Sequence, residues 1–131
     1  MKCLDTSLLI DLMRRQPGAV EAVERALEDG AVTTELNAFE LYAGAHDDGR
    51  PVDEDMVAIA KVLRRMDVLP LTRQVSLRAA SILSLLRSRG QDIGTLDTLI
   101  AAISLVHGID IIVTDNADHF RRVPGLKVET Y

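Results

Sequence analysis

The tripeptide Leu-Asp-Thr occurs twice in this 131-residue chain, at positions 4–6 and 96–98, and each copy opens an apolar segment. Two more acids have similar apolar neighbours: Glu40 within "NAFELYA" and Asp115 within "IIVTDNA". A buried carboxylate is costly unless it is paired, protonated or bound to a cation. A hard divalent cation such as Mg²⁺ takes oxygen ligands, so Asp5, Glu40, Asp97 and Asp115 are candidate metal ligands.

Each of these acids also has a simpler structural explanation. Asp5 could cap the first helix, and Asp97 could interact with a helix dipole. Glu40 could pair with a nearby arginine, and Asp115 could be a turn residue in "TDNAD". A purely structural role for all four is a weaker explanation, because all four lie where the predicted sheet places a binding site.

Short strand patterns alternate with helical patterns along the chain, which predicts a mainly parallel α/β sheet with helices on its faces. The expected helices span 7–14 (capped by Thr6 or Ser7), 19–29, 35–45, 52–66, 73–89 and 96–107, with a break at 16–18 and a loop at 44–51. The expected strands are 1–4, 31–34, 67–71, 110–114 and 126–130, the last at an edge.

Ligands bind at the carboxyl ends of the strands in such sheets. Asp5 and Asp115 directly follow predicted strands, Glu40 lies six residues past another, and Asp97 begins an almost entirely apolar helix. We therefore expect the acids to converge at one edge of the sheet. One or two Mg²⁺ ions there could activate water and stabilise the leaving oxygen in phosphodiester hydrolysis.

Composition limits the other possibilities. A net charge of −5 argues against tight, nonspecific nucleic-acid binding unless several acids gather around a cation. The single cysteine excludes an intrachain disulfide. No segment has the length of a membrane span or the form of a signal peptide, so we expect one cytoplasmic domain over residues 1–131. Nucleophile-elbow and phosphate-loop motifs are absent.

Four segments, by their order and spacing, resemble PIN-domain ribonucleases, and specifically the VapC-type toxins of toxin–antitoxin pairs. They are "LDTSLLIDLM" at 4–13, "TTELNAFELYAGA" at 33–45, "IGTLDTLIAAISLVHG" at 93–108 and "IIVTDNADHFRRVPGLKVETY" at 111–131. The resemblance implies a three-layer α/β/α PIN-like domain with about four to five strands. It also implies an endoribonuclease that uses Mg²⁺ or Mn²⁺ to activate the attacking water.

Carried over to this chain, the family's acidic site consists of Asp5, Glu40, Asp97 and a fourth acid after the last buried strand. Many PIN domains place that fourth acid where this chain has Asn116, which Asp115 and Asp118 flank. We assign the role to Asp115. Hydroxyl groups that resemble those of the family near its site come from Thr6 and Thr114.

The resemblance further implies a cognate VapB-like antitoxin, whose C-terminal segment enters a groove near the first helices, and a homodimer. Arginines on the rim of the acidic site would grip RNA phosphates: Arg14, Arg15, Arg121 and Arg122. The simpler explanation is that these arginines lie on solvated helix faces.

Two other interpretations stay open. A haloacid-dehalogenase-like phosphatase would need a second acid two residues after the first, where this chain has Ser7. A catalytically inert PIN-like or receiver-like interaction module would not need the complete set of acids.

Overall fold

The computed structural model describes residues 1–47 and 49–131, and its described strands form one parallel sheet in the order β3-β2-β1-β4-β5. The central strand β1 pairs with β2 through Cys3 opposite Val32, and with β4 through Leu4 opposite Val113. The strands are β1 (Lys2–Leu4), β2 (Ala31–Thr34), β3 (Asp67–Leu69), β4 (Ile111–Val113) and β5 (Lys127–Glu129).

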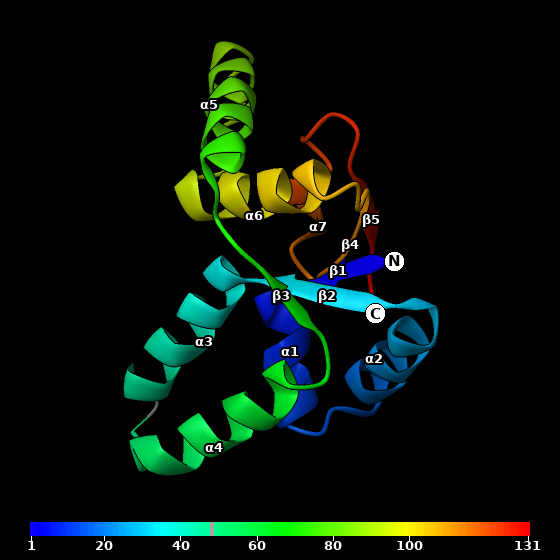
Figure 1. Ribbon diagram of the computed structural model, residues 1–131, viewed down its shortest axis with the longest axis vertical. Helices are drawn as coiled ribbons and strands as arrows, with labels where there is room; N and C mark the ends of the chain where they lie inside the picture. Colours follow the sequence, from blue (N-terminus) through cyan, green and yellow to red (C-terminus); the bar gives the residue numbers. More distant parts are fainter. Residues whose placement is uncertain (48) are drawn as a thin grey trace.

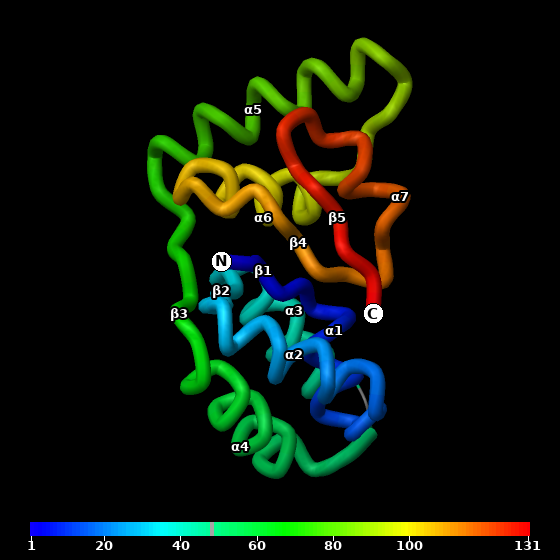
Figure 2. The backbone as a smooth tube through the Cα atoms, turned by 90° about the vertical axis from the view of Figure 1, so that its right-hand side faces the viewer, coloured from blue at the N-terminus to red at the C-terminus, as the bar shows by residue number. Residues whose placement is uncertain are grey.

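Helices cover both faces of this sheet, which confirms the three-layer α/β/α prediction (Figures 1 and 2). The four helices α1 to α4 pack on one face, and α5, α6 and α7 pack on the other. Their bounds are α1 (Thr6–Met13), α2 (Pro17–Asp29), α3 (Glu35–Asp47), α4 (Val52–Leu63), α5 (Arg73–Ser88), α6 (Thr95–Val106) and α7 (Ala117–Phe120).

Alternate residues of the inner strands enter opposite cores, as the two-residue period of a strand requires. Cys3 and Ile112 enter the core beneath α5 and α6, whereas Leu4 and Val113 enter the core beside α1 and α2. This pairing aligns the ends of β1 and β4. The residues that follow the two strands therefore meet at the same edge of the sheet.

The structure corrects several predicted boundaries. The loop expected from Gly44 is wrong at its start, because α3 continues to Asp47; position 48 lies outside the described residues. The helix expected to reach Met66 ends at Leu63. Pro17 begins α2 instead of only ending the preceding segment, since the first helical position needs no N–H donor.

Two further features differ from expectation. Asp5, and not Thr6 or Ser7, is the N-cap residue of α1, although its carboxylate makes no capping hydrogen bond. The four-residue helix α7 was not expected. None of the helices in the described ranges has the length and apolar character needed to span a membrane, and the cytoplasmic location stays a prediction.

Candidate active site

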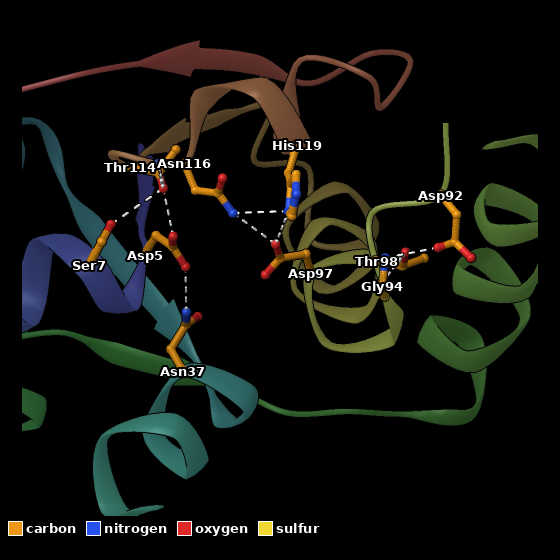
Figure 3. A network of polar contacts seen from close by, with 10 residues as sticks. All are labelled: Asp5, Ser7, Asn37, Asp92, Gly94, Asp97, Thr98, Thr114, Asn116 and His119. Atoms are coloured by element: carbon orange, nitrogen blue, oxygen red, sulfur yellow. Dashed lines mark hydrogen bonds and ion pairs between the residues drawn. The ribbon is translucent and has the colours of Figure 1, made fainter. Parts of the chain in front are cut away.

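Asp5 lies at the carboxyl end of β1, where it is only 6% exposed. Its Oδ2 accepts a hydrogen bond from Thr114 Oγ1 at 2.6 Å, and its Oδ1 accepts one from Asn37 Nδ2 at 3.0 Å (Figure 3). Burial raises the pKa of Asp5, and the charge of Asp97 raises it further, while both hydrogen bonds lower it. The fold therefore holds this carboxyl group firmly, in surroundings that disfavour its charge.

Asn37 joins three segments at the site and is completely buried. Its backbone N–H donates to Thr34 Oγ1 at 3.2 Å, and its Oδ1 accepts from the Thr34 N–H at 3.2 Å. This reciprocal pair is a capping-box arrangement at the start of α3. The Asn37 amide nitrogen remains available to donate to Asp5 and to Thr6 Oγ1, each at 3.0 Å. One side chain thus starts α3 and orients the first acid.

Glu40 comes to the same place from α3, one turn after Asn37. The Thr6 hydroxyl donates to Glu40 Oε1 at 2.8 Å, so the threonine predicted to lie near the site links two site segments. Burial raises the pKa of Glu40, and the charges of Asp5 and Asp97 act in the same direction, while the bond from Thr6 lowers it. The three acids therefore influence one another electrostatically.

Asp97 occupies the first turn of α6, with its side chain 19% exposed. Its Oδ2 lies 2.8 Å from His119 Nδ1 and 3.1 Å from Asn116 Nδ2. Figure 3 shows both partners above Asp97, on the segment that follows β4. The backbone N–H of Asn116 in turn donates to Thr114 Oγ1 at 2.9 Å, so one short segment contacts both Asp5 and Asp97.

Asp115, the acid assigned as the fourth ligand, is exposed. Its backbone N–H donates to Ser7 Oγ at 3.1 Å. In the described part of the chain, no hydrogen bond joins its carboxylate to the other three acids. Asp118 is also exposed, in the first turn of α7. The residue of this segment that contacts an acid is Asn116, while the ligand role of Asp115 stays a prediction.

Sequence reasoning missed two residues of this network, Asn37 and His119. A signal for Asn37 existed: it is the one amide between positions 31 and 45, three residues before Glu40 and so on the same helix face. The sequence offers no comparable signal for His119. Its partner is a carboxylate 22 positions earlier, and no local pattern reveals such a contact.

The three acids fit a divalent cation with few protein ligands. No lysine or arginine in the described ranges forms an ion pair with Asp5, Glu40 or Asp97. Among the described residues, no three Asp, Glu, His or Cys side chains lie close enough together to hold a metal ion by themselves. Mg²⁺ usually binds through one or two carboxylates and keeps several waters. The oxygen-rich, unneutralised group of acids matches that requirement.

The predicted rim arginines divide into two groups. Arg14 ends α1 and lines a pocket of about 210 Å³ together with Glu40 and residues of α1, α3 and α4. Arg15 is exposed beside it. Arg121 and Arg122 directly follow α7, which carries His119. Arg14 and Arg15 lie between Asp5 and Glu40 in the chain, and Arg121 and Arg122 follow Asp115. The contact of these arginines with RNA stays a prediction.

The model of the PIN domain family matches residues 2–126, so the chain belongs to that family, as its sequence motifs indicated. A tRNA(fMet)-specific endonuclease VapC of Shigella flexneri is 27% identical over 128 residues, which cover 98% of this chain and 96% of that relative. Ribonuclease VapC19 of Mycobacterium tuberculosis is 26% identical over 129 residues, with 97% and 98% covered.

Solved structures give the same fold. VapBC-1 of nontypeable Haemophilus influenzae superposes with a TM-score of 0.84 at 27% identity, covering 98% of this chain and 96% of that one. VapBC2 of Rickettsia felis, bound to a DNA fragment from its promoter, superposes with a TM-score of 0.89 at 18% identity, covering 99% and 98%.

Proposed function

We propose that this chain is a metal-dependent endoribonuclease and the toxin of a VapBC-like toxin–antitoxin pair. The observation that carries the proposal is the hydrogen-bond network that links Asp5, Glu40 and Asp97 at the carboxyl edge of the sheet. The PIN domain match and the ribonuclease names of the relatives support RNA as the substrate.

Asp5, Glu40 and Asp97 would hold the cation, Mg²⁺ or Mn²⁺, and Asp115 would serve as a further ligand. When bound, the ion supplies a Lewis acid for the phosphodiester and lowers the pKa of a water ligand. The chain itself orients the carboxylates. Thr114 and Asn37 fix both oxygens of Asp5. Thr6 fixes Glu40 from the start of α1.

The overall charge of −5 makes local cations important for RNA binding. Phosphate contacts from arginine position a nucleic acid without reading its sequence. Arg14, Arg15, Arg121 and Arg122 would supply these contacts on either side of the acids. Their loss would weaken RNA binding and raise the KM, with a smaller effect on the kcat.

A cleavage assay on a structured RNA with Mg²⁺ or Mn²⁺ tests the proposal. We expect EDTA, Asp5→Asn and Asp97→Asn each to abolish cleavage. Asp110→Asn is the matched control, because Asp110 is exposed and pairs with Lys127 at 3.4 Å, away from the network. Cleavage that survives chelation or both site substitutions would exclude the metal-nuclease function and favour an inert interaction module. Phosphatase activity without RNA cleavage would favour the haloacid-dehalogenase-like alternative.

The antitoxin proposal rests on the neighbours, which are VapBC assemblies, and on the pocket among α1, α3 and α4. Ile10, Leu41 and Ile59 give this pocket apolar walls, and Glu40 and Arg14 give it charged residues. An antitoxin segment there would cover one of the acids. The antitoxin proposal predicts a small antitoxin-like gene just upstream, and co-expression with its product should yield a complex without nuclease activity. Failure of the two to co-purify would contradict the pairing. Light scattering on the isolated chain tests the predicted homodimer.

A further inference from the structure

His119 and Asn116 converge on a single atom of the proposed active site. Both nitrogens contact Asp97 Oδ2, at 2.8 Å and 3.1 Å, and they lie 3.0 Å from each other. Among the hydrogen bonds of the described residues, none involves the other oxygen of Asp97, Oδ1. Figure 3 shows that oxygen on the side of Asp97 toward Asp5.

The chemistry of the two partners fixes the direction of these contacts. The amide nitrogen of Asn116 can only donate, and a carboxylate oxygen can only accept. In the Nδ1–H tautomer, His119 donates to Oδ2, and the 3.0 Å approach between Asn116 Nδ2 and His119 Nδ1 is then a contact between two donors and not a hydrogen bond. Two donors on one oxygen leave the carboxylate little freedom to rotate, and they leave Oδ1 available to a cation.

The surroundings of the pair point to the same role. Asn116 is anchored through its own N–H to Thr114 Oγ1, whose hydroxyl donates to Asp5. His119 lies in α7, directly after the segment that reaches Asp5, and its side chain is 39% exposed. A half-exposed side chain adds little to core packing. Its specific contact is the carboxylate of Asp97.

We propose that His119, acting with Asn116, is a positioning residue that holds Asp97 through Oδ2 so that Oδ1 faces the metal. The inference rests on the proposed function, because it concerns the same cation. In this arrangement, a residue of α7 orients an acid that α6 carries. Partners that orient metal-binding carboxylates contribute to metal affinity without touching the ion.

Calorimetric titration of the purified full chain with Mn²⁺ tests the proposal. We expect His119→Ala to weaken Mn²⁺ binding about 10-fold, the lower end of the usual loss for such partners. His119→Asn should retain affinity within about 3-fold, because its amide nitrogen places a donor near the position of Nδ1. The matched control is His107→Ala. His107 is exposed at the other end of α6, where its Nδ1 lies 2.8 Å from the Ile103 carbonyl oxygen.

Melting temperatures in EDTA separate positioning from a merely structural role. A positioning role predicts weaker Mn²⁺ binding with an unchanged metal-free melting temperature. A lower melting temperature with unchanged Mn²⁺ affinity would overturn the inference. If His119→Ala does not fold, Asn116→Ala removes the other donor to Oδ2 and should also weaken binding; unchanged affinity there would overturn the inference equally.

Two more outcomes are decisive. If His119→Asn binds as weakly as His119→Ala, and the wild type shows nitrogen coupling to Mn²⁺ by electron paramagnetic resonance, His119 is a direct ligand and the positioning role is wrong. A wild type that binds no divalent cation would overturn the proposed function and this inference together. If the wild type binds Mn²⁺ and cleaves RNA, and His119→Ala changes neither activity, the inference is overturned while the proposed function stands.

Discussion

At the scale of single residues, Asp5 is placed where folding and function make opposite demands. The end of β1 buries its carboxyl group, and burial raises its pKa. Metal binding needs the charged form. Thr114 and Asn37 partly resolve this conflict, because their donors favour the carboxylate.

The substitution Asp5→Asn should separate the effect of the buried charge on stability from its effect on metal binding. It removes the buried charge and its repulsion by Asp97, so we expect the free energy of unfolding in EDTA to rise by about 1 kcal/mol. The added stability that Mg²⁺ gives the wild type should disappear. Urea denaturation with and without Mg²⁺ measures both effects. An Asp5→Asn variant that Mg²⁺ stabilises as strongly as the wild type would show that the cation binds elsewhere.

The pH dependence of stability follows from the same carboxyl groups. The pKa values of Asp5 and Glu40 are raised above 3.8 and 4.5, so the folded chain binds their protons more tightly than the unfolded chain does. Their contribution to stability is therefore present at low pH and is lost as pH rises through the raised values. In EDTA, wild-type stability should fall with pH relative to an Asp5→Asn, Glu40→Gln double variant. Parallel curves for the two proteins would contradict these shifts.

The sequence revealed the acids but not the side chains that hold them. Asp5, Glu40 and Asp97 were recognisable because a carboxylate in an apolar run needs an explanation. Asn37 and His119 are ordinary polar residues whose roles arise from contacts 32 and 22 positions away. The fourth ligand stays a prediction for a related reason: a one-residue difference decides which side chain faces inward after β4, and "TDNAD" offers three candidates.

At the scale of elements, the turn between α1 and α2 combines strain with a proposed substrate contact. Arg15 has φ of 58°, the only positive value at a non-glycine residue in the described chain. A side chain in this left-handed region costs roughly 1 kcal/mol relative to glycine. The chain keeps an arginine there, beside Arg14 and the pocket that Glu40 lines.

Two substitutions at Arg15 separate backbone from side chain. Arg15→Ala removes the guanidinium and keeps the strain, whereas Arg15→Gly removes both. We expect Arg15→Gly to be more stable than Arg15→Ala by about 1 kcal/mol in urea denaturation. Both should weaken RNA binding equally. Equal stability of the two variants would mean that the turn relaxes and stores no strain. Unchanged RNA binding would show that Arg15 is only a solvated surface residue.

The sequence patterns predicted the strands of the sheet well, but they predicted the shortest helix and one helix end poorly. Every expected strand is present, because short runs of apolar and β-branched residues mark the strands, and a glycine stops the chain segment before three of them. The helix α7 escaped notice because four residues give no periodicity. The extension of α3 to Asp47 was hidden by a run of polar residues and glycine that is typical of loops. Contacts with neighbouring helices determine where such helices end, and the local sequence does not reveal these contacts.

At the scale of the whole molecule, Cys3 reports on the integrity of the sheet. It is completely buried in β1, and burial raises its pKa to about 12. A thiol reacts as the thiolate and only where a reagent can reach it. We expect no reaction of the native chain with a disulfide reagent at pH 8 and full reaction in urea. The labelling rate in mild urea should match the rate of global unfolding; rapid labelling of the native chain would reveal local opening of β1.

The pairing of β1 with β4 also determines when the site can form during synthesis of the chain. Asp5 is among the first residues synthesised, yet Thr114, Asn116 and His119, which hold Asp5 and Asp97, come more than 100 residues later. The candidate active site of the nascent chain therefore stays incomplete during almost the whole of translation. The proposed nuclease could therefore not cleave RNA near the ribosome until its last strands had emerged, and the proposed antitoxin would have that interval in which to bind it.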